Sequence, residues 1–337
     1  MADYEVSKLM WMGIVVALAA SIFVVAQPNI KSVASDTLAN VQKVVDQIQL
    51  PGDNNGNSNE KPNPDDPKWV VKANYGDNGY FLMDGDGNAV VYALDDSKPI
   101  VLAGAPKQTS GNVDLKNLEY LNNVELNISG SSYNNFFSGD SNLESIKGLD
   151  KWDTSKTTIM DGMFKGLTSL KTLDISHFNT SNVTRMGSMF AGTSSLTSLD
   201  LSNFNTSKVT YMPDMFSNMS SLKNLNVSSF NTSVCTDISG IFQGTSGLTT
   251  LDVSNFNTSN IISFNKVFKG MSSLENLNIS NWDASKGSQM ANMFSGDSSL
   301  VSVTVDNVKS GPAYDQTDMF TDVNSDVASK LKSALVK

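Results

Sequence analysis

The sequence has very few of the side chains on which enzyme and metal chemistry most often depends. With a single cysteine, Cys235, the chain cannot form an intrachain disulfide or a cysteine-based zinc site. With a single histidine, His177, a Ser-His-Asp or Cys-His arrangement could be built only around that one residue. No glycine-rich phosphate-binding motif is present. We therefore expect a protein that is not an enzyme and that needs no metal or cofactor.

Positive charge is also scarce. The 337 residues include 24 lysines and arginines against 34 aspartates and glutamates, which gives a formal net charge of −10 at pH 7. Nucleic-acid-binding domains carry a clustered basic surface that neutralises phosphates. This composition therefore argues against DNA or RNA as a partner.

One long uncharged run stands near the start of the chain. Met10–Ala26 is apolar for 17 residues, at the lower limit for a membrane-spanning helix. We expect residues 1–27 to form a retained transmembrane or filament-core helix. The alternative is a cleaved signal peptide, because the run ends in the small residue Ala26. The leading segment contains Asp3, Glu5 and only one lysine, whereas signal peptides usually begin with a basic segment.

An amphipathic pattern follows this run. Apolar or small residues recur at alternating spacings of four and three, which is typical of a coiled-coil seam: Ile30, Ala34, Thr37, Val41, Val44 and Ile48. We expect residues 28–50 to form a stalk helix that self-associates, or alternatively a monomeric helix lying on the membrane or on its own domain. Residues 51–67 are rich in Asn, Gly, Pro and Asp and are expected to be a flexible linker.

Residues 68–129 have the alternation and turn residues of a small β-rich module. The segments 69–73, 79–83 and 89–94 are expected to be strands, the last two joined as a β-hairpin. The turn also begins like a calcium loop, with Asp84, Asp86 and Asn88 in a D-x-D-x-N spacing. Ala89 stands where that loop needs glycine and Asp95 where it needs glutamate, so the hairpin is favoured. This module is expected to cap the repeats that follow.

The rest of the chain repeats one unit. Phenylalanines fall 26 residues apart at Phe164, Phe190, Phe216, Phe242, Phe268, Phe294 and Phe320. Within a unit, apolar residues follow the L-x-x-L-x-L spacing of leucine-rich repeats, as at Leu170, Leu173 and Ile175. The spacing then becomes helical at Val183, Met186 and Met189. Each unit is therefore predicted to be a short strand followed by a short helix or 3₁₀ turn, stacked into a solenoid.

Three motifs within the unit, F-N-T-S-x-V-T-x-M, M-F-x-G and S-S-L-x-x-L-D-L-S, resemble the 26-residue leucine-rich repeats of BspA-like surface proteins of Gram-positive bacteria and mycoplasmas. The resemblance implies an α/β-type leucine-rich repeat solenoid over residues 130–323, with cell-surface display and adhesion. It brings no catalytic residue. Residues 324–337 are expected to be a helical C-terminal cap, with Val327, Leu331 and Leu335 on one face.

The N-terminal helix has a second resemblance, to the helix of type IV pilin-like subunits. An apolar first half, a later amphipathic half and the acidic residue Glu5 near the start carry it. In that family the acidic residue pairs with a neighbouring subunit in the filament core, which is the role Glu5 would take. The sequence departs from the pattern because it has no Gly-ended basic leader, and because its proline, Pro28, lies later than in pilins.

Equivalent residues of successive repeats should form outward stripes about 4.8 Å apart along the strand face. We expect this polar face to bind a ligand, through two stripes whose members are Thr172, Asn224 and Asn276, and Asp174, Asp200, Asn226, Asp252 and Asn278. A merely soluble face is the alternative. A further stripe at the strand exit, containing Asn179 and Asn205, is expected to bond backbone groups of its turn.

Together these patterns predict a non-catalytic, membrane-tethered bacterial surface protein with an extracellular repeat domain. Its expected partners are the membrane, through the N-terminal helix, and a host or cell-surface glycan or protein. The alternative is a pilin-like subunit whose N-terminal helix self-associates in a filament core and displays the repeats.

Overall fold

The computed structural model describes residues 61–337 except 75–76, 87, 103–116, 121–123 and 127–135. The chain forms two compact units, Met1–Glu60 and Lys61–Lys337, and every described residue belongs to the second. The expected N-terminal helix lies outside the described residues, together with the predicted packing residues Glu5, Ile30, Ala34, Val41, Val44 and Ile48. Within the described part, every helix falls short of the length and apolar character that crossing a bilayer requires.

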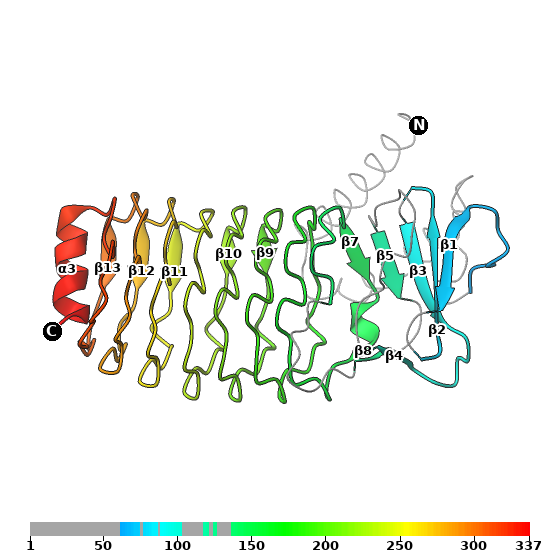
Figure 1. The fold of residues 1–337 in the computed structure, drawn as a ribbon, viewed down its shortest axis with the longest axis horizontal. Coiled ribbons are helices and arrows are strands. Elements are labelled where there is room, and N and C mark those ends of the chain that lie inside the picture. Colours follow the sequence, from blue (N-terminus) through cyan, green and yellow to red (C-terminus); the bar gives the residue numbers. More distant parts are fainter. Residues whose placement is uncertain (1–60, 75–76, 87, 103–116, 121–123, 127–135) are drawn as a thin grey trace, which may run out of the picture. The chain divides into compact units, whose positions relative to one another are not determined.

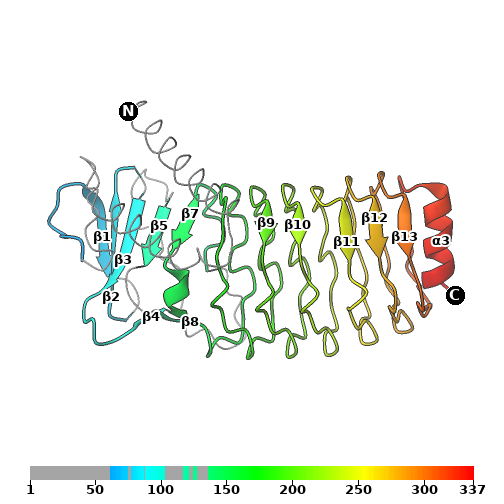
Figure 2. The ribbon, with the colours of Figure 1, turned by 180° about the vertical axis from the view of Figure 1, so that it is seen from behind.

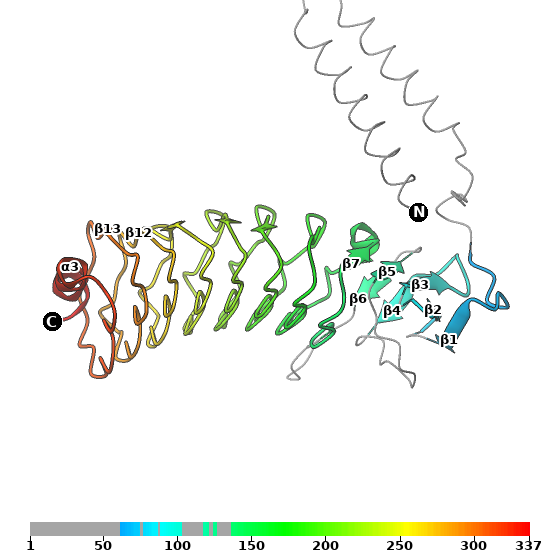
Figure 3. The ribbon, with the colours of Figure 1, turned by 90° about the horizontal axis from the view of Figure 1, so that it is seen from above.

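The repeats form a solenoid in which each 26-residue unit, here called a coil, pairs in parallel with the next. Ser198 pairs with Asn224 and Thr250 with Asn276, so the register between neighbouring coils is one full repeat. Successive strands lie side by side in Figures 1 and 2, and Figure 3 shows the coils following one another towards the C-terminal helix. The strands are β9 (Ser198–Leu199), β10 (Asn224–Leu225), β11 (Thr250–Asp252), β12 (Asn276–Asn278) and β13 (Ser302–Thr304).

A short helix or a 3₁₀ turn was predicted after each strand; the helix is wrong, because tight turns occupy this segment and the coils are built of strands and turns. In the coil after residue 185, alternate amides leave their own coil and donate to the next one. The donors are Met186, Ser188, Phe190 and Gly192, and the acceptors are the carbonyl oxygens of Tyr211, Pro213, Met215 and Ser217, at 2.7–3.0 Å. An α-helix needs each of these amides to bond four residues back within the same segment. The inter-coil ladder therefore excludes the helix.

Tight turns give this segment its helix-like spacing. Between the ladder bonds, the amides of Met189 and Ala191 donate three residues back, to Met186 and Ser188. Ser188 and Gly192 have positive φ angles of 55° and 74°, which close these turns. The glycine of the M-F-x-G motif therefore forms a turn corner and does not end a helix.

Stacked aromatic rings fill the interior of the solenoid. The ring centroids of neighbouring phenylalanines in the 26-residue series lie 5.3–6.0 Å apart, with interplanar angles of 5–18°. Phe216, for example, lies between Phe190 and Phe242 and is fully buried. Because each ring packs on the equivalent ring of the next coil, the period of the sequence becomes a continuous core.

Buried threonines also tie the coils together, which the sequence analysis did not anticipate. Each hydroxyl donates to a carbonyl oxygen of the next coil at 3.0–3.1 Å, and in four of the five coils it also accepts that residue's amide at 2.7–2.8 Å. These threonines are 0–1% exposed: Thr154, Thr180, Thr206, Thr232 and Thr258. The neighbouring asparagines do as expected and bond backbone amides of their own turn, as when Asn205 accepts from Ser207 at 3.0 Å.

The N-terminal module continues directly into the solenoid. The hairpin is confirmed, since β2 and β3 pair in antiparallel fashion, and β3 pairs in parallel with β5 and β5 with β7. One sheet therefore crosses residue 129, where a boundary was predicted. Its strands are β1 (Trp69–Asn74), β2 (Gly79–Asp84), β3 (Asn88–Ala93), β5 (Asn117–Tyr120) and β7 (Ser145–Lys147). A second sheet contains β4 (Ile100–Leu102), β6 (Val124–Leu126) and β8 (Trp152–Asp153), the last preceded by the 3₁₀ helix η1 (Leu149–Lys151).

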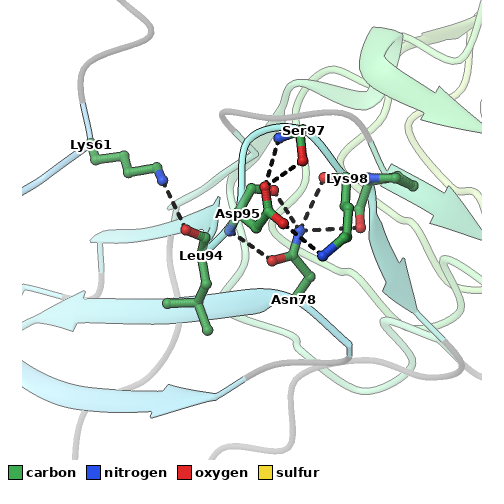
Figure 4. A network of polar contacts seen from close by, with 7 residues as sticks. Lys61, Asn78, Leu94, Asp95, Ser97 and Lys98 are labelled. Atoms are coloured by element: carbon green, nitrogen blue, oxygen red, sulfur yellow. Dashed lines mark hydrogen bonds and ion pairs between the residues drawn. The ribbon is translucent and has the colours of Figure 1, made fainter.

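Two polar corners hold this module. At the hairpin turn, Asp84 accepts the amides of Asp86 and Asn88 at 2.9 Å, so the D-x-D-x-N carboxylate caps the turn. At the other end of β3, the side chain of Asn78 bonds Asp95 in both directions, donating to its carbonyl oxygen at 2.8 Å and accepting its amide at 2.7 Å (Figure 4). Lys98 pairs with the Asp95 carboxylate at 2.7 Å.

The C-terminal cap is confirmed as a helix, α3 (Ser325–Leu335), which follows β13 in Figure 1. Val327, Leu331 and Leu335 are its buried residues, as the spacing predicts. The side chain of Asn324 accepts the amides of Asp326 and Val327 and caps the first turn. An apolar helix face thus covers the last coil.

Candidate functional site

The residues predicted to bind a ligand on the strand face do lie together. Thr250 and Asp252 pair with Asn276 and Asn278 in the parallel ladder, so each stripe runs from coil to coil. All eight predicted residues are exposed except Asn278, which is half-buried. The structure therefore brings these side chains onto one polar face.

The side chains of the second stripe, however, are already engaged in the fold. In every coil the side-chain oxygen of the second stripe accepts the amide of the serine two residues later at 2.9–3.1 Å; the acceptors are Asp174, Asp200, Asn226, Asp252 and Asn278. The hydrogen bonds from Ser176 hold the pKa of Asp174 below its ordinary value. These Asx turns end each short strand, which gives the stripe a structural role.

A second polar surface lies over the turns, where M-F-x-G segments of successive coils pack side by side; we call it the turn face. It contains a groove of about 370 Å³, at the lower end of the range for ligand pockets. The groove crosses five consecutive coils. Its polar lining includes Lys165, Ser188, Asp214, Asn218, Gln243 and Lys266.

Charge in this groove is concentrated on three side chains. Asp214 is half-buried, and burial raises its pKa above the ordinary value, with the charge of Asp237 adding to the rise. Lys165 and Lys266 oppose the shift by stabilising the carboxylate. No hydrogen bond or ion pair within the described residues engages the side chains of these three lining residues. They are therefore available to a ligand in a way that the strand-face carboxylates are not.

A position without a side chain, Gly240, lies beside the Asp214 carboxylate. The equivalent position in successive coils is Gly162, Ser188, Asp214, Gly240 and Lys266. A Cβ atom on Gly240 would collide with the Oδ1 atom of Asp214, and φ at Gly240 is 61°. Glycine therefore leaves this carboxylate room that other residues would take.

This groove was not predicted from the sequence, although the sequence contains a signal for it. The predicted site was chosen from positions that repeat with little change, whereas the groove is made at a position whose identity changes from coil to coil. Repeated polar residues build the scaffold, and departures from the repeat distinguish one part of its surface from another.

The single cysteine and the single histidine are not among the residues that line this groove. Burial raises the pKa of the Cys235 thiol to about 11, so it is protonated and unreactive at neutral pH. His177 is exposed, with its Nδ1 atom 3.2 Å from the Ser176 hydroxyl. No group of three or more His, Cys, Asp or Glu side chains converges as metal ligands in the described part of the chain.

One buried carboxyl group stands apart from the groove. Asp297 is fully buried, its Oδ1 atom accepts the Met271 amide at 2.9 Å, and its Oδ2 atom has no partner among the described residues. Burial raises the pKa of this carboxyl to about 8, although the amides of Met271 and Gly270 act in the opposite direction. Burial therefore favours the neutral form of the Asp297 carboxyl.

Comparison with solved structures finds three leucine-rich repeat proteins of gut bacteria. A leucine-rich repeat protein from Eubacterium ventriosum is 13% identical, with a TM-score of 0.34 over 76% of this chain and 90% of that one. One from Bacteroides ovatus is 16% identical, with a TM-score of 0.28 over 73% and 79%. A leucine rich cell surface protein from Faecalibacterium prausnitzii is 13% identical, with a TM-score of 0.19 over 73% and 95%.

Comparison with curated protein sequences gives no significant match. A family model matches the repeat region twice, over residues 131–249 and 215–333, and together these matches cover more than half of the chain. The expected resemblance to 26-residue leucine-rich repeats is confirmed by this match and by the coil register, whereas the pilin resemblance falls on residues outside the described ones. The chain belongs to the family described as Mycoplasma protein of unknown function, DUF285.

Proposed function

We propose that the protein is a non-catalytic recognition module on a bacterial cell surface, where it binds a host or cell-surface glycan or protein and so mediates adhesion. The observation that carries this proposal is the contrast between the two faces of the solenoid. Strand-face carboxylates and amides cap turns, whereas Lys165, Asp214 and Lys266 on the turn face have no such structural task. Charged side chains that the fold does not use, gathered in a groove, favour binding of a polar ligand.

The proposed attachment is a membrane tether at the N-terminus. The apolar run Met10–Ala26 is its support in the sequence, and the Asn- and Gly-rich stretch that follows residue 50 would separate the tether from the repeats. Self-association through the seam of residues 30–48 also remains a prediction that the sequence pattern alone supports.

Surface exposure is the property to test first. Intact bacteria producing the full chain are treated with an added protease, with a cytoplasmic protein of the same cells as the control. We expect loss of the repeat domain while the control protein stays intact. Cleavage only after lysis would contradict the proposed location, because the protease would then have had no access to the protein.

Binding is tested with the purified full chain in detergent, on an array that carries both glycans and matrix proteins. Specific binding that survives washing supports recognition. Binding to no component of either class would contradict the proposed function.

A further inference from the structure

The turn-face groove has the dimensions and position of a site for an extended ligand. Its lining comes from five consecutive coils, from Lys165 in the first to Lys266 in the last. With coils spaced by about 4.8 Å, these two residues begin from backbones roughly 19 Å apart along the stack. A ligand lying along the stack would therefore meet one lysine near each end and Asp214 between them.

The charges of the groove determine which sign of charge on a ligand is favoured there. The lining itself carries two lysines and one aspartate, an excess of one positive charge in a chain whose formal net charge is −10, and Asp237, which also acts on Asp214, lies outside the lining. An anionic group is attracted to this place more than to the surrounding acidic surface. A wholly anionic polymer, by contrast, is disfavoured at the centre of the groove because Asp214 would repel it.

The uncharged lining selects the chemical class. Ser188, Asn218 and Gln243 offer hydroxyl and amide groups that both donate and accept hydrogen bonds, and Asp214 adds an acceptor. No aromatic or large aliphatic side chain lines the groove. A peptide would leave its apolar side chains without a pocket there, whereas a ligand dense in hydroxyl groups can pair with most of the lining.

Taken together, the geometry points to an acidic saccharide as the ligand of this groove. A sugar carboxylate pairs with Lys165 or Lys266, and neighbouring sugar hydroxyls donate to Asp214 and bond the amides of Asn218 and Gln243. This inference rests on the proposed recognition function and names the ligand class and the residues for it.

The inference is tested with the full chain on an array that carries glucuronic-acid-containing, sialic-acid-containing and neutral saccharides. The wild-type protein is compared with two double variants of equal charge, Lys165→Ala/Lys266→Ala and Lys208→Ala/Lys286→Ala. Lys208 and Lys286 are exposed lysines of the same solenoid that bond Asn182 and Asn260, outside the groove. The pair of variants therefore separates a local effect from a general loss of positive charge.

We expect the wild type to prefer acidic saccharides and the groove variant to bind at least about tenfold more weakly, because each lost contact is a charge-assisted hydrogen bond. The control variant should bind within about twofold of the wild type. Thermal melting of both variants checks that the coils remain folded, and Lys165→Arg/Lys266→Arg should retain most of the binding.

Three results would overturn the inference: preference for neutral saccharides, equal losses in the two double variants, or unchanged binding in the groove variant. If the protein binds another component of the array and the groove variant binds it equally well, the inference fails and the recognition function stands. If no saccharide of this array binds, the inference fails, and the recognition function fails as well only if the matrix proteins of the other array do not bind either.

Discussion

Replacement of Thr206 by valine tests how the coils are held together. The Thr206 hydroxyl donates to the carbonyl oxygen of Asn231 at 3.1 Å and accepts the amide of the same residue at 2.8 Å. Thr206 is fully buried, and valine has nearly the same shape. The substitution therefore removes two inter-coil hydrogen bonds with little change in packing.

The expected cost follows from those two bonds. Each is worth about 0.5–1.5 kcal/mol, and a buried group left unpaired costs about 1–3 kcal/mol. Because the backbone of Asn231 is only partly buried, we expect Thr206→Val to lower the free energy of unfolding by about 2–4 kcal/mol in total. Thr206→Ser keeps the hydroxyl and loses one methyl group, so it should cost about 1 kcal/mol.

Urea unfolding of the full chain, followed by circular dichroism, measures both variants. The serine variant should be more stable than the valine variant. Burial of apolar surface alone would give the opposite order, because valine is the more hydrophobic residue. Hydrogen exchange adds a local readout, since the Asn231 amide should exchange faster in the valine variant and at its wild-type rate in the serine variant. A valine variant as stable as the wild type would show that the threonine column does not hold the coils.

Two further predictions concern the stacked core and the buried carboxyl of Asp297. Phe216→Ala should cost about 3–5 kcal/mol in the urea experiment, because it interrupts the ring column with a cavity; a cost below that of Thr206→Ser would contradict the stacking. Burial raises the pKa of the Asp297 carboxyl in the folded protein from its ordinary value of 3.8 to about 8. Its neutral form therefore favours folding fully below about pH 4, and this stability is lost, on the order of a few kcal/mol, as the pH rises through 8. Asp297→Asn should remove this dependence of folding stability on pH. A wild type that is equally stable at pH 4.5 and pH 8 would contradict the prediction.

The solenoid can be predicted well from the sequence because a fixed repeat period determines which residues of neighbouring coils pack against each other. Phe190 and Phe216 are equivalent residues of neighbouring repeats, and equivalent residues of stacked units must meet. The C-terminal helix could be predicted for a related reason, since Val327, Leu331 and Leu335 share a face only in a helix.

The conformation of the segment after each strand could not be predicted from the spacing of its apolar residues. Met186 and Met189 are spaced as on a helix, but consecutive tight turns produce the same spacing of buried residues. The difference lies in whether backbone amides bond within the segment or to the next coil. That choice depends on the neighbouring coil, which no local pattern contains.

The candidate site could be predicted only in part. The sequence places Asp174 and Asp200 on one exposed face, and the structure agrees. It does not tell that each carboxylate accepts a serine amide two residues later, nor that the side chain missing at Gly240 leaves room for Asp214. Both facts depend on backbone geometry at single positions, so they appear only in the folded coils.

One comparison of aspartate-to-asparagine variants tests the division between a structural strand face and a binding turn face most directly. Asparagine keeps the side-chain oxygen that caps the strand-face turns, as Asn226 and Asn278 already do, so both variants should fold. Binding of the full chain to its preferred saccharide is measured for Asp214→Asn and for the triple variant Asp174→Asn/Asp200→Asn/Asp252→Asn. We expect Asp214→Asn to lose about fivefold or more in affinity and the triple variant to stay within about twofold of the wild type. A triple variant that loses binding while Asp214→Asn keeps it would assign recognition to the strand face and contradict the account.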